Sequence, residues 1–478
     1  MNRRAPPAAF VRRPPQGMKA AVAAAAAQAT AGPPTLEVDP AQALHLAIGL
    51  HREGRLDAAE RIYRALAGSG GEGDANVLHF LGMLLHQRGR SDEALALMRR
   101  SIAADPTVAD WHSNLGNVLL ERARLDEAAE AYEEALRLAP ERPAFHNNLG
   151  VLRREQGRFP EAQQAYRRAI ELAPGHSDAY ANCGNLLLAM GQPEQALAMF
   201  FEALVRAPHH AKTKRLLGMA YFNLGRLEEA VAVYRAWLAE EPGNAEAAHH
   251  LAACSGEQVP ERAADGYVEQ VFDGFAGSFD AKLAMLHYRA PSLVAGQLAA
   301  CVGAPRAALD ILDAGCGTGL CGPLLAPFAR TLEGVDLSAG MLARAEPRQV
   351  YHRLVKAELT AFLQQSEAAS RDVIVSADTL CYFGRLAPVF EAARVALRPG
   401  GWLIFTLEAV DPDLHGPLPG DPSDGFILNP HGRYSHDGAA VRADLEAAGL
   451  EPVAFDSVHL RNENARPVQG WLVAARRR

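Results

Sequence analysis

Cysteine is scarce in this sequence, and its spacing excludes two common uses of the residue. The 478 residues contain six cysteines, none of them in a C-x-x-C pair. No histidine cluster accompanies them at the spacing of a zinc site. Scattered thiols in a chain of this length are typical of a reducing compartment. We therefore expect a cytoplasmic protein that holds no metal.

The sequence also lacks a basic excess and a long apolar run. It has 48 Lys and Arg against 56 Asp and Glu, a formal net charge of -8. Binding to nucleic acid needs concentrated Lys and Arg, because phosphates must be neutralised. No run of 18 or more strongly apolar residues occurs, as a membrane span would require. We expect neither nucleic acid nor membrane as a partner.

The first 40 residues are mostly Ala, Pro, Arg and Gln. Residues 18–31 (MKAAVAAAAAQATA) superficially resemble a secretory signal, with Lys19 before an apolar stretch. Alanine is only weakly apolar, however, and Pro14 and Pro15 stand just upstream. We expect residues 1–40 to be a disordered leader, with export as the alternative.

A period of 34 residues dominates the next part of the chain. The residues that recur at this period are Gly82, Gly116, Gly150, Gly184 and Gly218, then Ala94, Ala128, Ala162, Ala196 and Ala230, and then Pro106, Pro140, Pro174, Pro208 and Pro242. In the fullest unit, residues 113–140, Gly116 and Ala128 are small where two antiparallel helices must approach closely. Tyr132 would fill the seam, and Pro140 would end the second helix.

This pattern resembles the tetratricopeptide repeat over about residues 41–255. Residues 44–66 form a degenerate first unit, and residues 244–257 look like a solvated terminal helix, as the ends of an array require. The resemblance implies an all-α superhelix at residues 41–257, closed by a capping helix. Its concave face would bind a protein or a peptide segment.

Asparagines recur at one place in successive units. They are Asn114, Asn148 and Asn182, with Asn117 and Asn185 one turn further on. A row of carboxamides can pair with the backbone of an extended chain whatever its side chains. The spacing is similar to the asparagine ladder in the repeats of O-linked N-acetylglucosamine transferases. The alternative is that each asparagine bonds within its own repeat.

After residue 305, short β-like runs alternate with helical patterns, which is typical of a doubly wound α/β sheet. The expected strands are 309–315, 331–336, 372–377, 401–408, 451–460 and 470–475. The whole chain is thus expected to be a multidomain protein, with an α/β Rossmann-like domain at residues 305–478 after the repeats.

The first expected strand runs into a glycine loop, DILDAGCGTGL (310–320). A dinucleotide-binding loop would place its third glycine at 320, where Leu320 stands. The loop instead resembles the first motif of class I S-adenosylmethionine (SAM) methyltransferases. The resemblance implies that Gly315, Gly317 and Gly319 let the backbone approach the cofactor closely. Cys316 is counted among the cofactor-binding residues of this loop, and we expect it to be a small filler and not a nucleophile.

Two carboxylates accompany this loop. Asp313 would add negative charge near the cationic cofactor. Asp336, at the end of the second expected strand, would accept hydrogen bonds from both ribose hydroxyls, although such an acid would serve NAD equally. The resemblance continues in KAEL (356–359) and in the Pro-Gly-Gly turn within 395–408, and these matches favour SAM. The further cofactor-binding residues it implies are Leu337, Ala357, Glu358 and Ser376.

The methyl acceptor is expected near residues 373–386, after the fourth strand. Asp378 and Tyr382 are candidate catalytic residues there, and Asp378 would either take a proton from the acceptor or organise the loop. His436 is a third candidate, since histidine titrates near pH 6.5; its alternative is a capping or surface role. Residues 411–436 are rich in Pro, Gly and Asp and predict a substrate cap.

Residues 258–304 are expected to form a helical linker and lid. Phe272, Phe275 and Phe279 would cover the cofactor, or would simply pack between the array and the sheet. The order of the two parts is similar to a family of methyltransferases that carry tetratricopeptide repeats. One hypothesis is an enzyme whose repeats recruit a protein. The other is a non-catalytic scaffold with a vestigial SAM-binding fold. The intact loop and carboxylates favour the enzyme.

Overall fold

The computed structural model describes residues 39–69, 74–277, 279–410, 425–463 and 466–478. The expected leader at 1–40 lies almost wholly outside these residues. Residues 411–424 of the expected substrate cap also lie outside them. The chain divides into two compact units, Met1–Phe80 and Leu81–Arg478.

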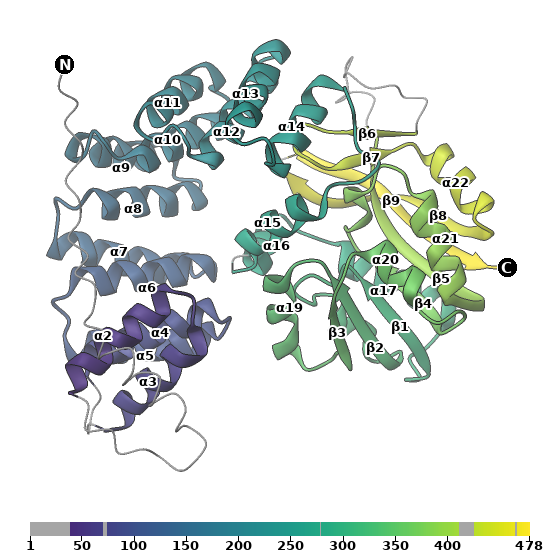
Figure 1. Cartoon of the computed structure of the whole chain (residues 1–478), viewed down its shortest axis with the longest axis horizontal. Helices are drawn as coiled ribbons and strands as arrows, with labels where there is room; N and C mark the ends of the chain where they lie inside the picture. Colours follow the sequence, from purple (N-terminus) through teal and green to yellow (C-terminus); the bar gives the residue numbers. More distant parts are fainter. Residues whose placement is uncertain (1–38, 70–73, 278, 411–424, 464–465) are drawn as a thin grey trace. The chain divides into compact units, whose positions relative to one another are not determined.

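The N-terminal half consists of helices that follow one another in pairs (Figure 1). They are α2 (Pro40–Arg52), α3 (Leu56–Ser69), α4 (Ala75–Gln87), α5 (Ser91–Ala104), α6 (Ala109–Glu121), α7 (Leu125–Leu138), α8 (Pro143–Glu155), α9 (Phe159–Leu172), α10 (Ser177–Ala189), α11 (Pro193–Arg206), α12 (Ala211–Asn223) and α13 (Leu227–Glu240). This confirms the all-α array expected from the 34-residue period.

At four of the five recurrent positions, Gly116, Gly150, Gly184 and Gly218, the glycine is required by the aromatic ring that faces it. A Cβ atom built on Gly116 would lie 2.6 Å from Cε1 of Tyr132, and one on Gly218 would lie 2.3 Å from Cζ of Tyr234. Both tyrosines are fully buried. A larger residue would therefore force the paired helices apart, and the expected close approach at these positions is confirmed.

The helix after the last pair, α14 (Ala245–Ser255), differs from the solvated terminal helix that the sequence suggested. Cys254 packs in the core of the last repeats. Ala253 packs in a second core, together with Tyr267 and Tyr434 from the C-terminal half. Because the helix has apolar neighbours on two sides, it joins the array to the segment that follows instead of ending it in solvent.

The C-terminal half is built on one sheet whose strands are β1 (Leu309–Ala314), β2 (Ala329–Asp336), β3 (Arg353–Lys356), β4 (Arg371–Ser376), β5 (Leu397–Ala409), β6 (Phe426–Leu428), β7 (Tyr434–His436), β8 (Leu450–Glu463) and β9 (Arg466–Arg477). The order is β3-β2-β1-β4-β5-β7-β6, and β9 pairs antiparallel with both β5 and β8. The strands β3, β6 and β7 have no counterpart among those expected, because runs of three or four residues show too little periodicity.

Helices cover both faces of the sheet. They are α15 (Asp265–Phe275), α16 (Phe279–Met285), α17 (Ala290–Val302), α18 (Gly322–Leu325), α19 (Ala339–Ala345), α20 (Leu359–Gln365), α21 (Ala387–Ala396) and α22 (Gly438–Ala447). Leu312 and Ile374 share one core with α20, α21 and α22, whereas their neighbours Ile311 and Val373 share another with α17 and α18. This alternation confirms the doubly wound α/β fold.

Strand order reverses between β1 and β4, which are adjacent and parallel. Loops that leave the carboxyl ends of two such strands diverge to opposite faces, and a crevice forms between them. The fold therefore brings the glycine loop after β1 next to residues 377–383 after β4.

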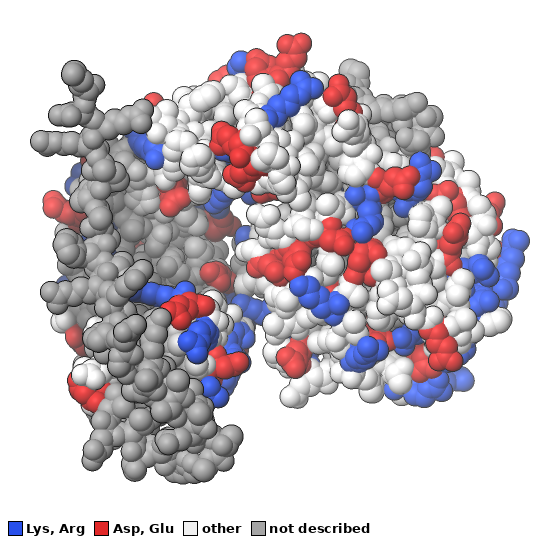
Figure 2. All heavy atoms as spheres, in the orientation of Figure 1, with Lys and Arg blue, Asp and Glu red and all other residues white. Residues whose placement is uncertain are grey.

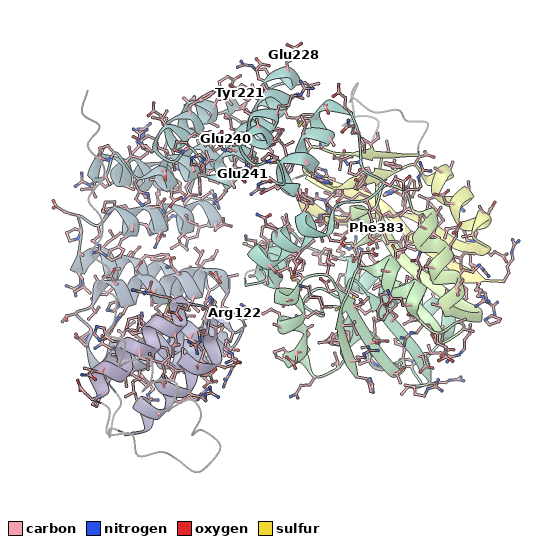
Figure 3. All side chains as sticks on the ribbon, viewed as in Figure 1. Arg122, Tyr221, Glu228, Glu240, Glu241 and Phe383 are labelled. Atoms are coloured by element: carbon pink, nitrogen blue, oxygen red, sulfur yellow. The ribbon has the colours of Figure 1, made fainter. Side chains whose placement is uncertain are left out.

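Charged side chains of both signs lie interspersed on the face seen in Figure 2. Some of them link neighbouring helices of the array. Lys214 on α12 contacts Glu240 on α13, which is labelled in Figure 3, at 2.6 Å, and Arg142 contacts Asp110 of the preceding repeat at 2.7 Å. Within the described ranges, no helix combines the length and the apolar character needed to cross a membrane.

Candidate functional site

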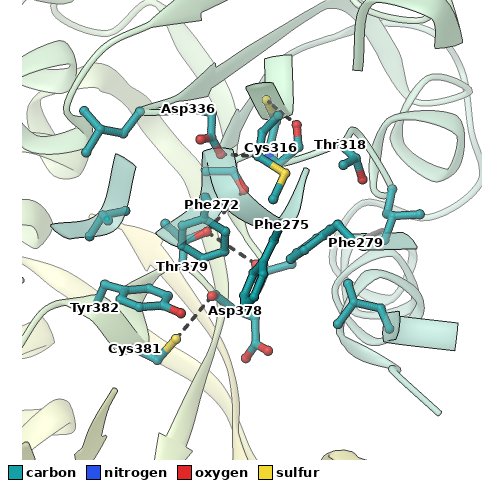
Figure 4. Close-up of a pocket in the computed structure, with 18 of the residues that line it drawn as sticks. Phe272, Phe275, Phe279, Cys316, Thr318, Asp336, Asp378, Thr379, Cys381 and Tyr382 are labelled. Atoms are coloured by element: carbon teal, nitrogen blue, oxygen red, sulfur yellow. Dashed lines mark hydrogen bonds between the residues drawn. The ribbon is translucent and has the colours of Figure 1, made fainter. Parts of the chain in front are cut away.

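A cavity of about 360 Å³ lies at the carboxyl edge of the sheet. Its walls come from the loop after β1, the ends of β2 and β3, the segment after β4, and the helices α15 and α16. The volume falls within the range of small-molecule sites, roughly 300–1,000 Å³. Figure 4 shows the rings of Phe272, Phe275 and Phe279 pointing into this space.

The glycine loop forms one wall of the cavity, and Gly315 and Gly317 face different surroundings. Gly315, Gly317 and Gly319 have φ values of 77°, 55° and 82°, which side chains rarely adopt. A Cβ atom on Gly315 would lie 2.1 Å from Oγ1 of Thr379. One on Gly317 would meet only Phe279, at 3.9 Å. Gly317 therefore leaves open space in the cavity, where a ligand can approach the backbone.

Asp336 lines the cavity at the end of β2. Its Oδ2 accepts a hydrogen bond from the N–H of Gly317 at 2.9 Å, and its Oδ1 accepts one from the N–H of Ser338 at 2.8 Å. Burial raises the pKa of this carboxyl. A carboxylate has about four acceptor positions, so each oxygen retains capacity for a further donor in the cavity.

Three of the expected cofactor residues do not line the cavity, namely Asp313, Gly319 and Ser376. Asp313 is buried, and its Oδ2 accepts from the hydroxyl of Tyr351 at 2.6 Å; its Oδ1 has no partner in the described part of the chain. Burial raises the pKa of Asp313 to about 7. The Ser376 hydroxyl donates to the carbonyl of Ala314 at 3.0 Å.

The other seven do line it: Gly315, Gly317 and Asp336, described above, and Cys316, Leu337, Ala357 and Glu358. The carboxylate of Glu358 accepts from the N–H groups of Thr360 and Ala361 at 3.0 and 2.8 Å, so it caps α20. Burial raises the pKa of the Cys316 thiol. The thiol is therefore protonated at neutral pH, which suits a small space-filling side chain.

Asp378 and Tyr382 line the cavity on the side of β4. Asp378 has a positive φ of 57°, and its N–H donates to Oγ1 of Thr406 at 2.9 Å. Its Oδ2 accepts from Arg461 at 2.5 Å, whereas no residue described here bonds its Oδ1. Burial raises the pKa of Asp378. The Tyr382 ring meets Phe272 of the lid edge to face, at 5.3 Å between centroids.

The third candidate, His436, lies outside the cavity lining. It is buried in β7, and its Nε2 lies 3.1 Å from the carbonyl of Gly384. Burial lowers its pKa to about 4. The ring is therefore neutral at pH 7 and its Nε2–H is used by a backbone carbonyl.

A largely buried ionic cluster adjoins Asp378, and most of its members were not predicted from the sequence. We define it as Asp378, Glu408, Arg433, Arg461 and Glu463. Arg461 bonds Asp378, Glu408 and Glu463, the last at 2.7 Å, and Arg433 bonds Glu408 at 2.5 Å and Glu463 at 2.8 Å. Burial alone would raise the pKa of Glu408, but the two guanidinium groups hold it well below its usual range. The one available signal was an acid within the apolar run GWLIFTLE (401–408).

Two acids attach the segment expected to be a lid to the loops after β1 and β2. Asp273 on α15 accepts from the Ser338 hydroxyl at 2.5 Å and from the N–H of Gly340 at 3.0 Å. Asp280 on α16 accepts from the Thr318 hydroxyl and from Arg348. Phe272, Phe275 and Phe279 all line the cavity, so the lid contributes rings as well as anchors. Among the described residues, no group of three His, Cys, Asp or Glu side chains is arranged to hold a metal.

On the array, some of the repeated asparagines bond between repeats. Asn148 donates to the Ser113 hydroxyl and to Oδ1 of Asn117, both at 3.2 Å, and Asn117 also accepts from the Tyr132 hydroxyl at 2.7 Å. Asn182 donates to Oδ1 of Asn147 at 3.0 Å. Asn114 also has an interaction partner. Asn185 is half-buried and shows no hydrogen bond of its side chain to any described residue.

Comparison with known proteins identifies both parts of the chain. A family model described as "Tetratricopeptide repeat" matches residues 44–109, 113–177 and 184–245, and a second model of that description matches residues 153–204. A model described as "Methyltransferase domain" matches residues 312–405. The last match contains the glycine loop, Asp336 and Asp378.

Curated relatives align with part of the chain. Methyltransferase-like protein 27 of Homo sapiens is 40% identical over 116 residues, which cover 22% of this chain and 47% of the relative. Ubiquinone biosynthesis O-methyltransferase of Hydrogenovibrio crunogenus is 29% identical over 154 residues, covering 30% and 61%. The chain thus spans about half the length of the curated relatives it matches.

Solved structures also resemble each part. A SAM-dependent methyltransferase from Methanosarcina mazei is 18% identical with a TM-score of 0.30, covering 36% of this chain and 93% of that one. The type IV pilus biogenesis factor PilW is 19% identical with a TM-score of 0.41, covering 44% and 96%. From the family matches, the chain carries tetratricopeptide repeats in its N-terminal part and a methyltransferase domain in its C-terminal part.

Proposed function

We propose that the chain is an enzyme that transfers a methyl group from SAM to an acceptor, and that its repeats recruit a protein. This protein is either the acceptor or the carrier that delivers it. One observation supports the proposal most strongly: the cavity places the open backbone of Gly317 beside the carboxylate of Asp336. A vestigial fold would have no chemical need to keep that space clear.

The residues of the cavity fit SAM in three respects. Asp336 has acceptor capacity for the ribose hydroxyls, and Gly317 leaves room for a ligand against the loop. Phe272, Phe275 and Phe279 provide aromatic faces, which attract cations such as a sulfonium. Ala357 and Leu337 add an apolar wall. The aromatic faces support SAM over a dinucleotide, together with Leu320 at the position of the third glycine.

When bound, SAM supplies an electrophilic methyl group. The chain's part is then mainly to align the acceptor and to exclude water. Asp378 and Tyr382 line the side of the cavity after β4, and Oδ1 of Asp378 has no partner among the residues described. We assign this oxygen the hydrogen bond from an acceptor O–H or N–H, and the proton if the acceptor must lose one. His436 has no part in this proposal because it lies outside the cavity lining.

Calorimetry and radiolabelling test the proposal on the full chain. The chain should bind SAM, and its demethylated product, with one site per molecule. With SAM labelled in the methyl group, it should also transfer label to a component of a soluble cell extract. Binding without transfer to any fraction would favour the scaffold hypothesis, and absence of SAM binding would reject the enzyme.

The proposed recruiting role can be tested on the asparagines. Asn148 and Asn182 bond across repeats, so changing Asn114, Asn148 and Asn182 to Ala should lower array stability by about 1 kcal/mol per lost hydrogen bond. Capture of a partner from extract should weaken as well, without a change in SAM affinity.

Asn185→Ala is the matched variant, because its side chain makes no hydrogen bond to a described residue. It should weaken capture while the melting temperature stays the same. If the triple variant melts lower and capture by Asn185→Ala is normal, the asparagines serve the array alone.

A further inference from the structure

The turn that carries Arg433 into the cavity is held from outside by α14. The N–H of Asn429 donates to the carbonyl of Arg433 at 2.9 Å, and the N–H of Gly432 donates to the carbonyl of Asn429 at 2.8 Å, which closes the turn between β6 and β7. The ring of His249 bonds the carbonyl of Gly432 at 2.9 Å, and that of His250 bonds the carbonyl of Pro430 at 3.1 Å.

The hydrogen-bond partners determine which ring nitrogen of each histidine carries the proton. A carbonyl only accepts hydrogen bonds, so His249 must carry its proton on Nε2 and His250 on Nδ1. Burial lowers the pKa of His249, and it lowers that of His250 to about 3. Both rings are therefore neutral at pH 7, and each uses its only N–H to hold the turn.

Each of the two histidines also stacks on a tyrosine ring, which restricts its movement. His249 stacks on Tyr267 with 4.2 Å between centroids, and His250 stacks on Tyr234 of the last repeat at 5.5 Å. Gly432 has a φ of 91°, and a Cβ atom there would lie 2.1 Å from the Tyr267 hydroxyl. The turn is thus packed closely against α14 and α15.

On its inner side the turn leads directly to the ionic cluster. Arg433 lines the cavity, and its guanidinium bonds Glu408 at 2.5 Å and Glu463 at 2.8 Å. Both acids also bond Arg461, which holds Asp378. A displacement of the turn would therefore pull on the groups that fix Asp378, whereas Asp336 ends β2 and Gly317 lies in the loop after β1.

We propose that His249 and His250 are positioning residues for methyl transfer: through the turn at residues 429–433 they hold Arg433, and with it Asp378, at the acceptor end of the cavity. This inference rests on the proposed function. It gives the end of the repeat array a role in the reaction that is separate from recruitment.

The test compares full-length variants that remove or keep the two donors. His249→Leu combined with His250→Leu removes both, whereas His249→Gln combined with His250→Asn keeps an N–H near Nε2 and Nδ1 respectively. His209→Leu, at an exposed position of the array, is the control. The measurements are hydrogen exchange at the Gly432 amide, SAM affinity by calorimetry, and the rate of label transfer from SAM to soluble extract at saturating SAM.

In the leucine variant, we expect exchange at Gly432 to rise at least tenfold and label transfer to fall about tenfold, with SAM affinity changed less than twofold. The Gln/Asn variant should recover most of the rate. In an Arg433→Lys background, the leucine changes should add less than a twofold further loss, because coupled residues are not additive.

Unchanged exchange at Gly432 would overturn the inference, and so would an equal loss of SAM affinity and rate, which would indicate general unfolding. If the wild-type chain neither binds SAM nor transfers label, the proposed function fails. The exchange experiment would then still show whether α14 orders the turn.

Discussion

Asp336→Ala should weaken the binding of SAM by roughly 10- to 100-fold. Hydrogen bonds to a charged group contribute about 1.5–3 kcal/mol, and 1.4 kcal/mol corresponds to a factor of ten in affinity. The change also removes the acceptor of the Gly317 N–H, so the glycine loop loses its anchor. Both effects act on the ligand side of the cavity, and calorimetry on the full chain measures their sum.

Asp336→Asn separates the two effects. An amide has one oxygen, so it can accept from Gly317 or from Ser338 but not keep both bonds through separate oxygens. Its affinity for SAM should lie between wild type and Asp336→Ala. Asp456→Ala, at an exposed acid of β8, is the control and should bind normally. Wild-type affinity in Asp336→Ala would remove this carboxylate from the cofactor site.

Arg461→Met should destabilise the C-terminal half by about 3–5 kcal/mol, since the loss of one partner leaves buried charges uncompensated. Arg461 is 3% exposed and bonds three carboxylates, those of Asp378, Glu408 and Glu463. Without it, Arg433 still bonds Glu408 and Glu463, but Asp378 loses the guanidinium that bonds it. Thermal and urea unfolding, followed by the near-ultraviolet signal, would measure the loss.

A surface ion pair provides the comparison. Arg385 bonds Glu261 at 2.9 Å with both side chains well exposed, so Arg385→Met should cost less than about 1 kcal/mol. Adding Glu408→Leu to Arg461→Met should restore part of the stability, because it replaces an uncompensated buried charge with an apolar side chain. A loss no larger than that of Arg385→Met would mean that the cluster is hydrated or loosely held.

The pH dependence of the Arg461 variant has a definite sign. In the wild type, Arg433 and Arg461 offset the effect of burial and hold the pKa of Glu408 and of Glu463 below their usual values. Those carboxylates therefore stabilise the folded chain above their ordinary pKa, and this stability is lost as the pH falls. Removal of one guanidinium raises the folded pKa values, so the deficit of Arg461→Met should shrink toward acid pH.

Both halves of the fold could be predicted from the sequence because each depends on patterns between residues that are near one another in the chain. The 34-residue spacing of Gly, Ala and Pro reflects contacts between neighbouring helices, as the fit of Gly116 against Tyr132 shows. The glycine loop and Asp336 lie at the ends of adjacent strands, so strand order alone brings them together.

Contacts between distant segments escaped the same reasoning. Asp313 stands in the recognised motif, yet its side chain turns to Tyr351 and does not line the cavity. Arg461 reaches Asp378 across 83 residues, and His249 reaches Gly432 across 183. No spacing in the sequence encodes such pairs.

The sequence by itself determined the two architectures and the glycine loop at the cavity, because these depend on periodicity and on residues a few positions apart. Tertiary structure alone decided which acids face the cavity, which arginines neutralise them, and that the last helix of the array holds the turn at Arg433. The physical reason is that buried charges and buried imidazoles need partners, and packing of remote strands and helices supplies them.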